Sequence, residues 1–486
     1  MAGLITDTTP VLVGTGVVEQ RDGSREPLAL MEDALRRAGA PELLRRIERI
    51  LIPRGRWKYR DPGRAIADAV GATGAYTVLT QIGILQSTLI GEACAQIAAG
   101  DLTVAAVVGG EAGDRLRAAR KAGGKPVDTV IEEPADEVRR AEHELFHEAE
   151  TAVGLRDAVD FYALLESAYT SAAGRTVDQG RDEIARIYRR FSEIAADNPY
   201  AWRREALRES PPTEASIRDG SPMIAFPYNR SHVSSWSVDQ ASALVFCAAG
   251  TARELGIPES GWIFPVVNAE SNHMMQLCTR PELDRCPGAE VSGKAAFEHA
   301  GIGPDDLDLV ELYSCFPVAV QAYARELGID LGRDLTVTGG MPYAGGPFNS
   351  YVLQATCRMA ELLRERGGTG AVTTVSGVLT KQAVTLWSTE PGPRPFADID
   401  VTAEVAAKTQ PRKAREDFSG PGTVVAVTVL HTSDPPRVVA LVEDDSGVRG
   451  FGHSERPEVV ADVERRTWVG RAVVIEAGGE IAWPAG

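Results

Sequence analysis

Along the first 112 residues, short apolar runs alternate with amphipathic stretches. The apolar runs, bounded by glycine and proline, predict strands at residues 10–16, 46–53, 75–80 and 103–111. Apolar positions spaced three and four residues apart predict helices at residues 27–40 and 86–99. This order of strands and helices is typical of an α/β unit.

Residues 113–221 break this rhythm. They are rich in arginine and glutamate with few β-branched runs, and they predict a helical insertion or cap. Beyond them the earlier pattern returns and predicts a second α/β half. Its helices are expected at 241–250, 294–302, from 316 onward and at 348–368, and its strands at 261–270, 306–313, 371–377 and 383–389.

The C-terminal pattern differs again. Proline and alternating charges at residues 391–400 and 407–417 lack helical or strand periodicity, and they predict a linker. The apolar runs that follow are joined by short Asp, Pro and Gly turns and predict a small antiparallel β-barrel. These runs lie at residues 423–430, 437–444 and 468–476.

Composition and charge narrow the class of protein. Hydrophobic residues make up 44% and charged residues 24% of the 486 positions, which is typical of several globular units. The net charge of −17 argues against a nucleic-acid partner. No apolar run approaches the ~20 residues that span a bilayer, and no signal-peptide pattern opens the chain. We therefore expect a cytoplasmic protein without a membrane partner.

Cysteine and histidine patterns predict no metal centre. The six cysteines are scattered without a CxxC pair, so neither a zinc site nor a disulfide framework is indicated. Glu142, His143 and His147 share a helical face but lack the HExxH order, so a solvated helix is expected. His232 and His273 could each face a pocket, although a single histidine more often has a structural role.

Four sequence blocks follow one another in a specific order: CAQIAAGDLTVAAVVGGEA at 94–112, DLVELYSCFP at 308–317, GGMPYAGGP at 339–347 and VSGVLTKQA at 375–383. In order and spacing they resemble the thiolase superfamily, over about residues 8–397. The likeness is closest to sterol-carrier-type thiolases and thiolase-like proteins, with acetyl-CoA acetyltransferase as the implied class. It implies an α/β duplicated thiolase fold, with two βαβαβ-type halves in αβαβα layers and a helical loop domain that helps to bind coenzyme A.

The resemblance also implies domain boundaries. The N-terminal half comprises residues 1–112 and 222–258, the helical loop domain 113–221, and the C-terminal half 259–400. Residues 415–486 resemble the OB-type β domain of small proteins that pair with thiolase-like subunits. Because this segment is acidic, we expect it to bind an acyl chain or to contact the thiolase core rather than nucleic acid.

Thiolases use a cysteine nucleophile, a base that activates it and a second cysteine that moves protons. The turn at residues 81–86, where the resemblance places the nucleophile, contains no cysteine, and Cys94 lies on an apolar helix face that predicts a buried thiol. Tyr313 stands where the family has a histidine or an asparagine. Gly346 stands where the family has its histidine base. Ser376 replaces the second cysteine.

The candidate catalytic residues that remain are Tyr313, Cys315, Tyr343 and Ser376. Candidates for binding the coenzyme A part of a thioester are Gly346, Gly377 and His273. A tyrosine whose pKa is lowered can act as a general acid or base, and paired tyrosines resemble the arrangement in the superfamily's steroid side-chain retro-aldolases. The alternative is that both tyrosines are core aromatics and that the cysteine is a structural thiol.

We therefore expect a thiolase-like protein that binds an acyl-CoA thioester as substrate or ligand, with weak or no thiolysis. Two alternatives remain open: a carbon–carbon lyase that acts on a CoA thioester through tyrosines, and a non-catalytic partner subunit. A homodimer and a monomer both remain open. Thiolases usually dimerise beside the nucleophile strand, and an additional domain could block that face.

Overall fold

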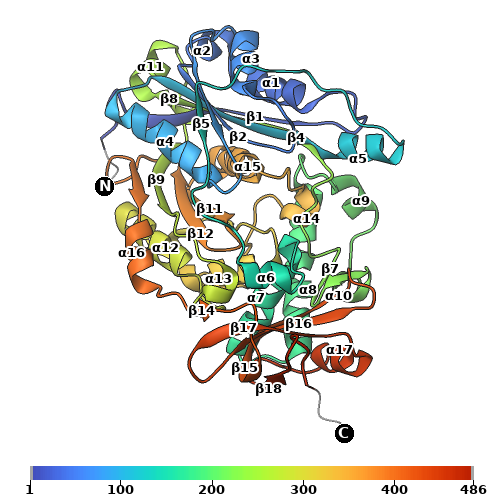
Figure 1. The fold of residues 1–486 in the computed structure, drawn as a ribbon. Coiled ribbons are helices and arrows are strands. Elements are labelled where there is room, and N and C mark those ends of the chain that lie inside the picture. The colour runs from blue at the N-terminus through green and yellow to red at the C-terminus, as the bar shows by residue number, and fades with distance from the viewer. Residues whose placement is uncertain (1–3, 483–486) are drawn as a thin grey trace.

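The computed structural model describes residues 4–482, which form three sheets and the helices around them (Figure 1). The first sheet has the strand order β1-β8-β4-β2-β3-β5. Strands β4, β2, β3 and β5 run parallel, whereas β8 pairs antiparallel with both β1 and β4. The bounds are β1 (Pro10–Glu19), β2 (Arg49–Pro53), β3 (Tyr76–Thr80), β4 (Val104–Ala112), β5 (Glu137–Arg139) and β8 (Asp239–Ala248).

Strand β8 corrects one prediction. The sequence predicts a helix at residues 241–250, and this prediction is wrong because most of the segment lies in β8, where every residue is buried. A central strand with both faces covered has a continuous apolar run, and such a run lacks the period of two that identifies a half-exposed strand.

The second sheet has the strand order β10-β11-β12-β9-β13. Its strands are β9 (Phe264–Ser271), β10 (Leu309–Glu311), β11 (Thr369–Ser376), β12 (Lys381–Ser388) and β13 (Ala397–Asp400). Strand β13 lies where the sequence predicts a linker, so that prediction is wrong at these residues. As an edge strand it alternates half-buried and exposed positions, and its two aspartates occupy the exposed ones, which explains the polar sequence.

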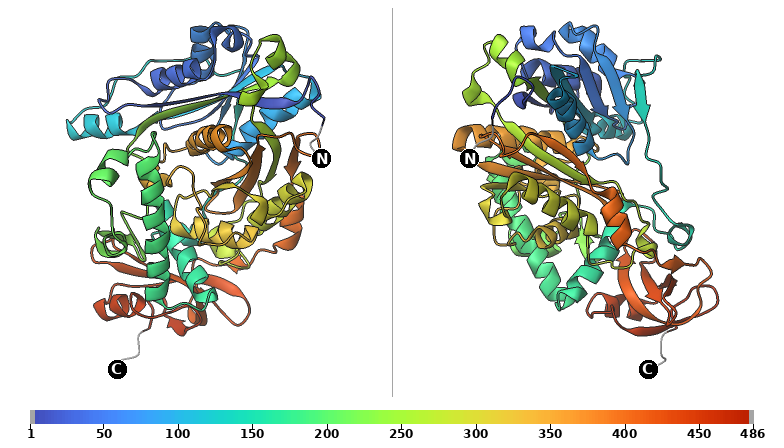
Figure 2. Two further views of the ribbon diagram at one scale, coloured as in Figure 1. Left: turned by 180° about the vertical axis from the view of Figure 1, so that it is seen from behind. Right: turned by 90° about the vertical axis from the view of Figure 1, so that its left-hand side faces the viewer.

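Two central helices separate these sheets. α4 (Gln86–Ala99) and α15 (Tyr351–Arg366) contact strands of both sheets. The outer face of the first sheet is covered by α1 (Pro27–Arg37), α2 (Pro41–Leu44), α3 (Pro62–Val70) and α11 (Ala249–Glu254), and that of the second by α12 (Pro287–Ala300) and α13 (Pro317–Leu327) (Figures 1 and 2). The result is a five-layer αβαβα arrangement. One core cluster includes α4, α15 and the second sheet, and another lies between the first sheet and its outer helices.

The helices of the insertion are α5 (Gly113–Lys121), α6 (Glu148–Ala152), α7 (Ala158–Ala172), α8 (Val177–Asp197), α9 (Arg204–Glu209) and α10 (Glu214–Asp219). The insertion contacts both sheets: α5 and β5 lie at the first sheet, and α7 packs on a helix of the second. α7 is buried over most of its length and packs on α13. α8 begins at a capping box in which Thr176 and Gln179 satisfy each other's backbone amides. The remaining short elements are α14 (Met341–Ala344), α16 (Thr402–Lys408) and 3₁₀ turns at Glu259–Gly261, Leu277–Thr279 and Pro304–Asp306.

The third sheet joins the C-terminal segment to the end of the insertion (Figure 1). Its strand order is β14-β17-β16-β15-β6-β7, and β18 also pairs with β15. The elements are β6 (Met223–Ala225), β7 (Tyr228–Asn229), β14 (Lys413–Ala414), β15 (Gly420–Leu430), β16 (Arg437–Glu443), β17 (Val448–Ser454), α17 (Pro457–Val463) and β18 (Ala472–Ile475). The OB-like interpretation and the domain boundaries remain predictions. Among residues 4–482, no helix has the length and hydrophobicity needed to cross a membrane.

Candidate functional site

The turn between β3 and α4 carries no thiol. Leu85 is fully buried at the N-cap of α4, and Gln86 begins the helix with its side chain buried. The Gln86 Oε1 accepts a hydrogen bond from the backbone amide of Val352 on α15, at 2.8 Å. Cys94 lies two turns further along α4, as buried as predicted, and burial raises the pKa of its thiol well above the usual value. A helix N-terminus can stabilise an anion, but the side chains at the N-terminus of α4 are those of Leu85 and Gln86, and neither forms an anion.

Tyr313 faces this turn from the second sheet. It follows β10, and its backbone amide donates to the Thr373 Oγ1 at 2.8 Å. Its phenol interacts with the side chain of Gln86, and its ring stands edge-on to that of Tyr351 with centroids 5.7 Å apart. Burial raises the pKa of Tyr313, so the phenol keeps its proton at neutral pH.

Cys315 is the only cysteine that is not fully buried. It directly precedes Phe316, the N-cap of α13, and its thiol interacts with the phenol of Tyr162 on α7. Burial raises the pKa of the thiol to about 12, although Tyr162 and the backbone amides of Phe316 and Cys315 itself oppose this shift. Within residues 4–482 the groups that interact with the thiol are a phenol and amides, and none of them is a base that could form a thiolate.

Tyr343 lies on α14 with its hydroxyl buried and without a hydrogen-bond partner among the described residues. Burial raises its pKa as well. Its ring meets that of Tyr188 on α8, with centroids 6.4 Å apart, and Tyr188 in turn meets His232 at 5.7 Å. Burial lowers the pKa of His232 to about 3, so this imidazole is neutral. Its Nδ1 accepts from the Asn229 amide at 3.3 Å, which leaves the proton on Nε2.

The glycine block after α14 is tightly packed. A Cβ at Gly346 would lie 2.1 Å from the Ser234 Oγ, and one at Gly345 would lie 2.2 Å from the Gln240 Oε1. Gly345 also has a φ of 102°, which disfavours any side chain. Ser234 therefore fills the space that a side chain at residue 346 would need. The Ser234 Oγ and the Gln240 Oε1 have no hydrogen-bond partner within residues 4–482.

Ser376 is the last residue of β11, and Gly377 begins the turn to β12. Gly377, Val378 and Leu379 all have left-handed backbone conformations, with φ values of 62°, 54° and 64°. The buried Arg280 holds this turn, because its Nη2 donates to the Val378 carbonyl at 2.6 Å. A left-handed β-branched residue is strained, so the turn requires such support.

His273 lies near the same turn. It lines a small pocket together with Arg280 and Leu379, and its Nε2 is 2.9 Å from the Thr409 Oγ1. Burial, followed by the charge of His143, lowers the pKa of His273. The candidates thus form two groups, one around Tyr313, Cys315, Tyr343 and Gly346 and one around Ser376, Gly377 and His273.

Arg280 and Tyr162 connect the two groups, because the phenol of Tyr162 interacts with both Cys315 and the guanidinium of Arg280. Sequence reasoning missed both residues, as well as Gln86. An arginine in an acidic, loop-rich sequence gives no sign that it is buried. Tyr162 lies on a helix that is apolar on all sides, so the sequence does not distinguish it from a core residue. No cluster of three or more metal-ligating side chains occurs within residues 4–482.

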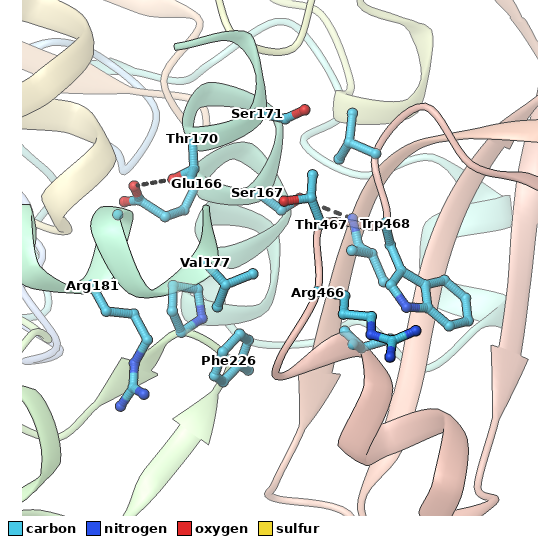
Figure 3. Close-up of a pocket in the computed structure, with 15 residues that line it drawn as sticks. Glu166, Ser167, Thr170, Ser171, Val177, Arg181, Phe226, Arg466, Thr467 and Trp468 are labelled. Atoms are coloured by element: carbon cyan, nitrogen blue, oxygen red, sulfur yellow. Dashed lines mark hydrogen bonds between the residues drawn. The ribbon is translucent and has the colours of Figure 1, made fainter. Parts of the chain in front are cut away.

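A separate pocket lies where α7 and the start of α8 meet the C-terminal segment at Arg466–Val469 (Figure 3). Glu166 stands in its wall and hydrogen-bonds to Thr170, as Figure 3 shows, and also accepts from the Tyr228 hydroxyl at 2.6 Å. Burial raises the pKa of Glu166 to about 7. None of the candidate site residues lines this pocket, which is narrow and mainly apolar.

Comparison with known proteins places this geometry in context. No protein-family model matches the chain. An acetyl-CoA acetyltransferase of Methanocaldococcus jannaschii is 26% identical over 167 residues, which cover 34% of this chain and 40% of that protein. A monomeric SCP2-thiolase-like protein type 1 from Mycobacterium smegmatis is 25% identical in structural alignment, with a TM-score of 0.81 over 99% of this chain and 100% of that one. The chain is thiolase-like in sequence and fold.

A second solved structure, an Ltp2–ChsH2(DUF35) aldolase, aligns with 80% of this thiolase-like chain and 98% of its own, at 16% identity and a TM-score of 0.57. This likeness shows the fold alone. The predicted likeness to the thiolase superfamily and the predicted α/β thiolase fold are confirmed, with acetyl-CoA acetyltransferases and an SCP2-thiolase-like protein among the similar proteins. The match to curated relatives spans only 40% of their length, so it does not establish activity or substrates for the thiolase-like chain.

Proposed function

We propose that this thiolase-like protein binds an acyl-CoA thioester without forming an acyl-enzyme, at the centre around Tyr313, Cys315 and Tyr343. The observation that carries the proposal is the β3–α4 turn, where a buried leucine and a buried glutamine occupy the helix N-terminus. The nearest partly exposed thiol, Cys315, has a pKa of about 12. A thiol of that pKa is almost entirely protonated at neutral pH and is a poor nucleophile.

The polar groups of this centre are suited to binding a carbonyl. Tyr313 and Tyr343 are neutral phenols, and the Tyr343 hydroxyl has no partner among the described residues. Both can donate a hydrogen bond. Donors in a buried site stabilise a thioester oxygen, whereas carbon–carbon cleavage also requires a group that accepts a proton.

The retro-aldolase alternative is therefore the weaker proposal. It is favoured by the fold likeness to the Ltp2–ChsH2(DUF35) aldolase, but burial moves the pKa of both tyrosines upward, opposite to what a tyrosine base needs. A non-catalytic partner subunit remains compatible with thioester binding. A cytoplasmic location is part of the proposal, supported by six cysteines that are all free.

Equilibrium titration with acetyl-CoA and longer acyl-CoAs tests binding, and intact-mass spectrometry after incubation tests for an acyl adduct. We expect binding with no adduct and no thiolysis of acetoacetyl-CoA. Tyr343→Phe should weaken acyl-CoA binding but leave binding of free CoA unchanged, because only the thioester supplies the carbonyl. Absence of binding at about 1 mM acyl-CoA contradicts the proposal, and so does an adduct that Cys315→Ser abolishes.

A further inference from the structure

A narrow cavity of about 30 Å³ lies on the second α/β half, between the turn after β11 and the N-terminus of α12. Its wall includes His273, Arg280, Gln382 and the apolar side chain of Val405. Exposed residues at its rim, among them Glu282, open it to solvent. A water needs roughly 10–15 Å³ of such volume, so the cavity has room for about two water-sized groups.

Arg280 lines this cavity as a buried cation. Only 7% of the residue is exposed, and it forms no ion pair with any residue in 4–482. Its Nε donates to the Met275 carbonyl and its Nη2 to the carbonyls of Gly377 and Val378, whereas its Nη1 has no hydrogen-bond partner among the described residues. Burial lowers the pKa of Arg280. A buried charge without a counter-charge is costly, so an anion in the cavity would stabilise it.

Two further polar features of the cavity wall are not satisfied by the protein. Gln382 is 1% exposed, and its Nε2 donates to the Leu379 carbonyl at 2.8 Å, but its Oε1 has no partner within residues 4–482. This oxygen lies at the first turn of α12, because a Cβ at Gly288 would be 2.1 Å from it. No side chain caps α12 at Cys286, so the N-terminus of this 14-residue helix favours an anion. The cavity thus combines a cation, helix amides and a buried acceptor.

The acidic residues nearby leave the charge of Arg280 uncompensated. Glu326 accepts from a backbone amide at the start of α12, but it is paired with Arg285 and Arg325. Glu150 influences Arg280 electrostatically without forming an ion pair with it. A ligand therefore has to supply the negative charge.

We propose that this cavity binds a short hydroxycarboxylate such as glycolate, with its carboxylate on Arg280 and the α12 amides and its hydroxyl donating to Gln382. Charge-assisted hydrogen bonds from a guanidinium to a carboxylate are strong, and an amide oxygen accepts only, so a hydroxyl beside the carboxylate satisfies it. The inference is independent of the proposed thioester binding, because none of the residues that line the cavity belongs to the centre around Tyr313. Occupation would also fix Arg280, which holds the strained turn after Ser376.

NMR titration of the whole chain with ¹³C-labelled ligands tests this site. The ligands are glycolate, acetate, which lacks the hydroxyl, and glycolamide, which lacks the charge, with chloride as a competitor. The charge variant is Arg280→Gln. Its control is Arg364→Gln, because Arg364 also donates to backbone carbonyls without an ion pair but lies outside the cavity. The filling variant is Val405→Ile, and Val401→Ile is its control in the same small core cluster.

We expect glycolate to bind with a dissociation constant of about 10 mM or less, and acetate about threefold or more weakly. Arg280→Gln and Val405→Ile should each weaken glycolate by about tenfold or more, and the two controls by less than about twofold. If Arg280→Gln does not fold, the comparison of Val405→Ile with Val401→Ile decides. No binding at about 100 mM glycolate, or equal binding of glycolamide, overturns the anion site. Equally tight binding of acetate or chloride overturns the assignment to a hydroxycarboxylate.

Discussion

Buried phenols in this protein fall into two kinds according to their hydrogen bonds. The Tyr351 hydroxyl donates to the Glu311 carboxylate at 2.5 Å and lies 2.7 Å from the Thr338 Oγ1. The Tyr343 hydroxyl is equally buried but has no partner among the described residues. A buried hydroxyl without a partner costs stability, so such a group in a native protein indicates a role other than support of the fold.

Phenylalanine at these two positions should have opposite effects on stability. Tyr351→Phe removes a hydrogen bond to a buried carboxylate and should lower the free energy of unfolding by about 1–3 kcal/mol. Tyr343→Phe removes only an unsatisfied hydroxyl and should be neutral or stabilising by about 1 kcal/mol. Urea unfolding of both variants measures the difference. A large loss for Tyr343→Phe would reveal a structural partner for its hydroxyl and remove the reason to assign it to ligand binding.

At the scale of elements, the sequence predicts most helices and strands of the two α/β halves, and the failures have physical causes. The helix prediction fails at β8 because a central strand has no alternation. The linker prediction fails at β13 because an edge strand can carry aspartates on its outer positions. The pattern of apolar and polar residues in a segment indicates which of its side chains face solvent. Strand pairing depends on residues far away in the chain; β13, for example, pairs with β9.

The turn after β11 illustrates such distant support. Its strained residues Val378 and Leu379 are held by Arg280, and the backbone of Arg280 and Pro281 accepts hydrogen bonds from Arg449 on β17. Arg449 is buried and paired with Glu443 at 2.7 Å. Arg449 and Arg280 thus connect the C-terminal sheet to the turn that follows Ser376.

A double-mutant cycle tests this link. Arg280→Lys and Arg449→Lys should each lower the free energy of unfolding by about 1–3 kcal/mol, because lysine cannot form the same set of carbonyl contacts. The double variant should cost less than the sum, with a coupling of about 0.5–3 kcal/mol. Arg253→Lys, at an exposed ion pair on α11, serves as the distant partner and should be additive with Arg280→Lys. Strict additivity of the first pair would show that the two arginines act independently.

At the scale of the whole molecule, the sequence predicts which residues surround the centre but not how they interact. Tyr313, Cys315, Tyr343 and Gly346 come together, whereas Ser376, Gly377 and His273 form a second group joined through Arg280. Arg280 lies within a loop, and nothing local distinguishes it from the many surface arginines.

The edge of the first sheet beside β3 is formed by a strand from the insertion. β5, which belongs to the insertion, pairs in parallel with β3 and occupies the edge beyond the strand that leads to the α4 turn. β3 therefore has hydrogen-bonded neighbours on both sides, β2 and β5. An edge strand with unpaired amides is a template for pairing with a second chain, and β5 removes that template at residues 78–80.

We therefore predict that the protein is a monomer, and that Val138→Pro shifts it toward self-association. Proline at the centre of β5 holds φ at about −65°, away from the roughly −120° of a parallel strand, and so disfavours pairing with Leu79. The edge of β3 then becomes available to a second copy. Sedimentation velocity at increasing concentration measures this, with Val127→Pro as the control because Val127 is exposed in the same insertion but outside any strand. A stable wild-type dimer would show that β5 does not prevent association. An unchanged monomer after Val138→Pro would show instead that another part of the chain, such as the C-terminal sheet, blocks it.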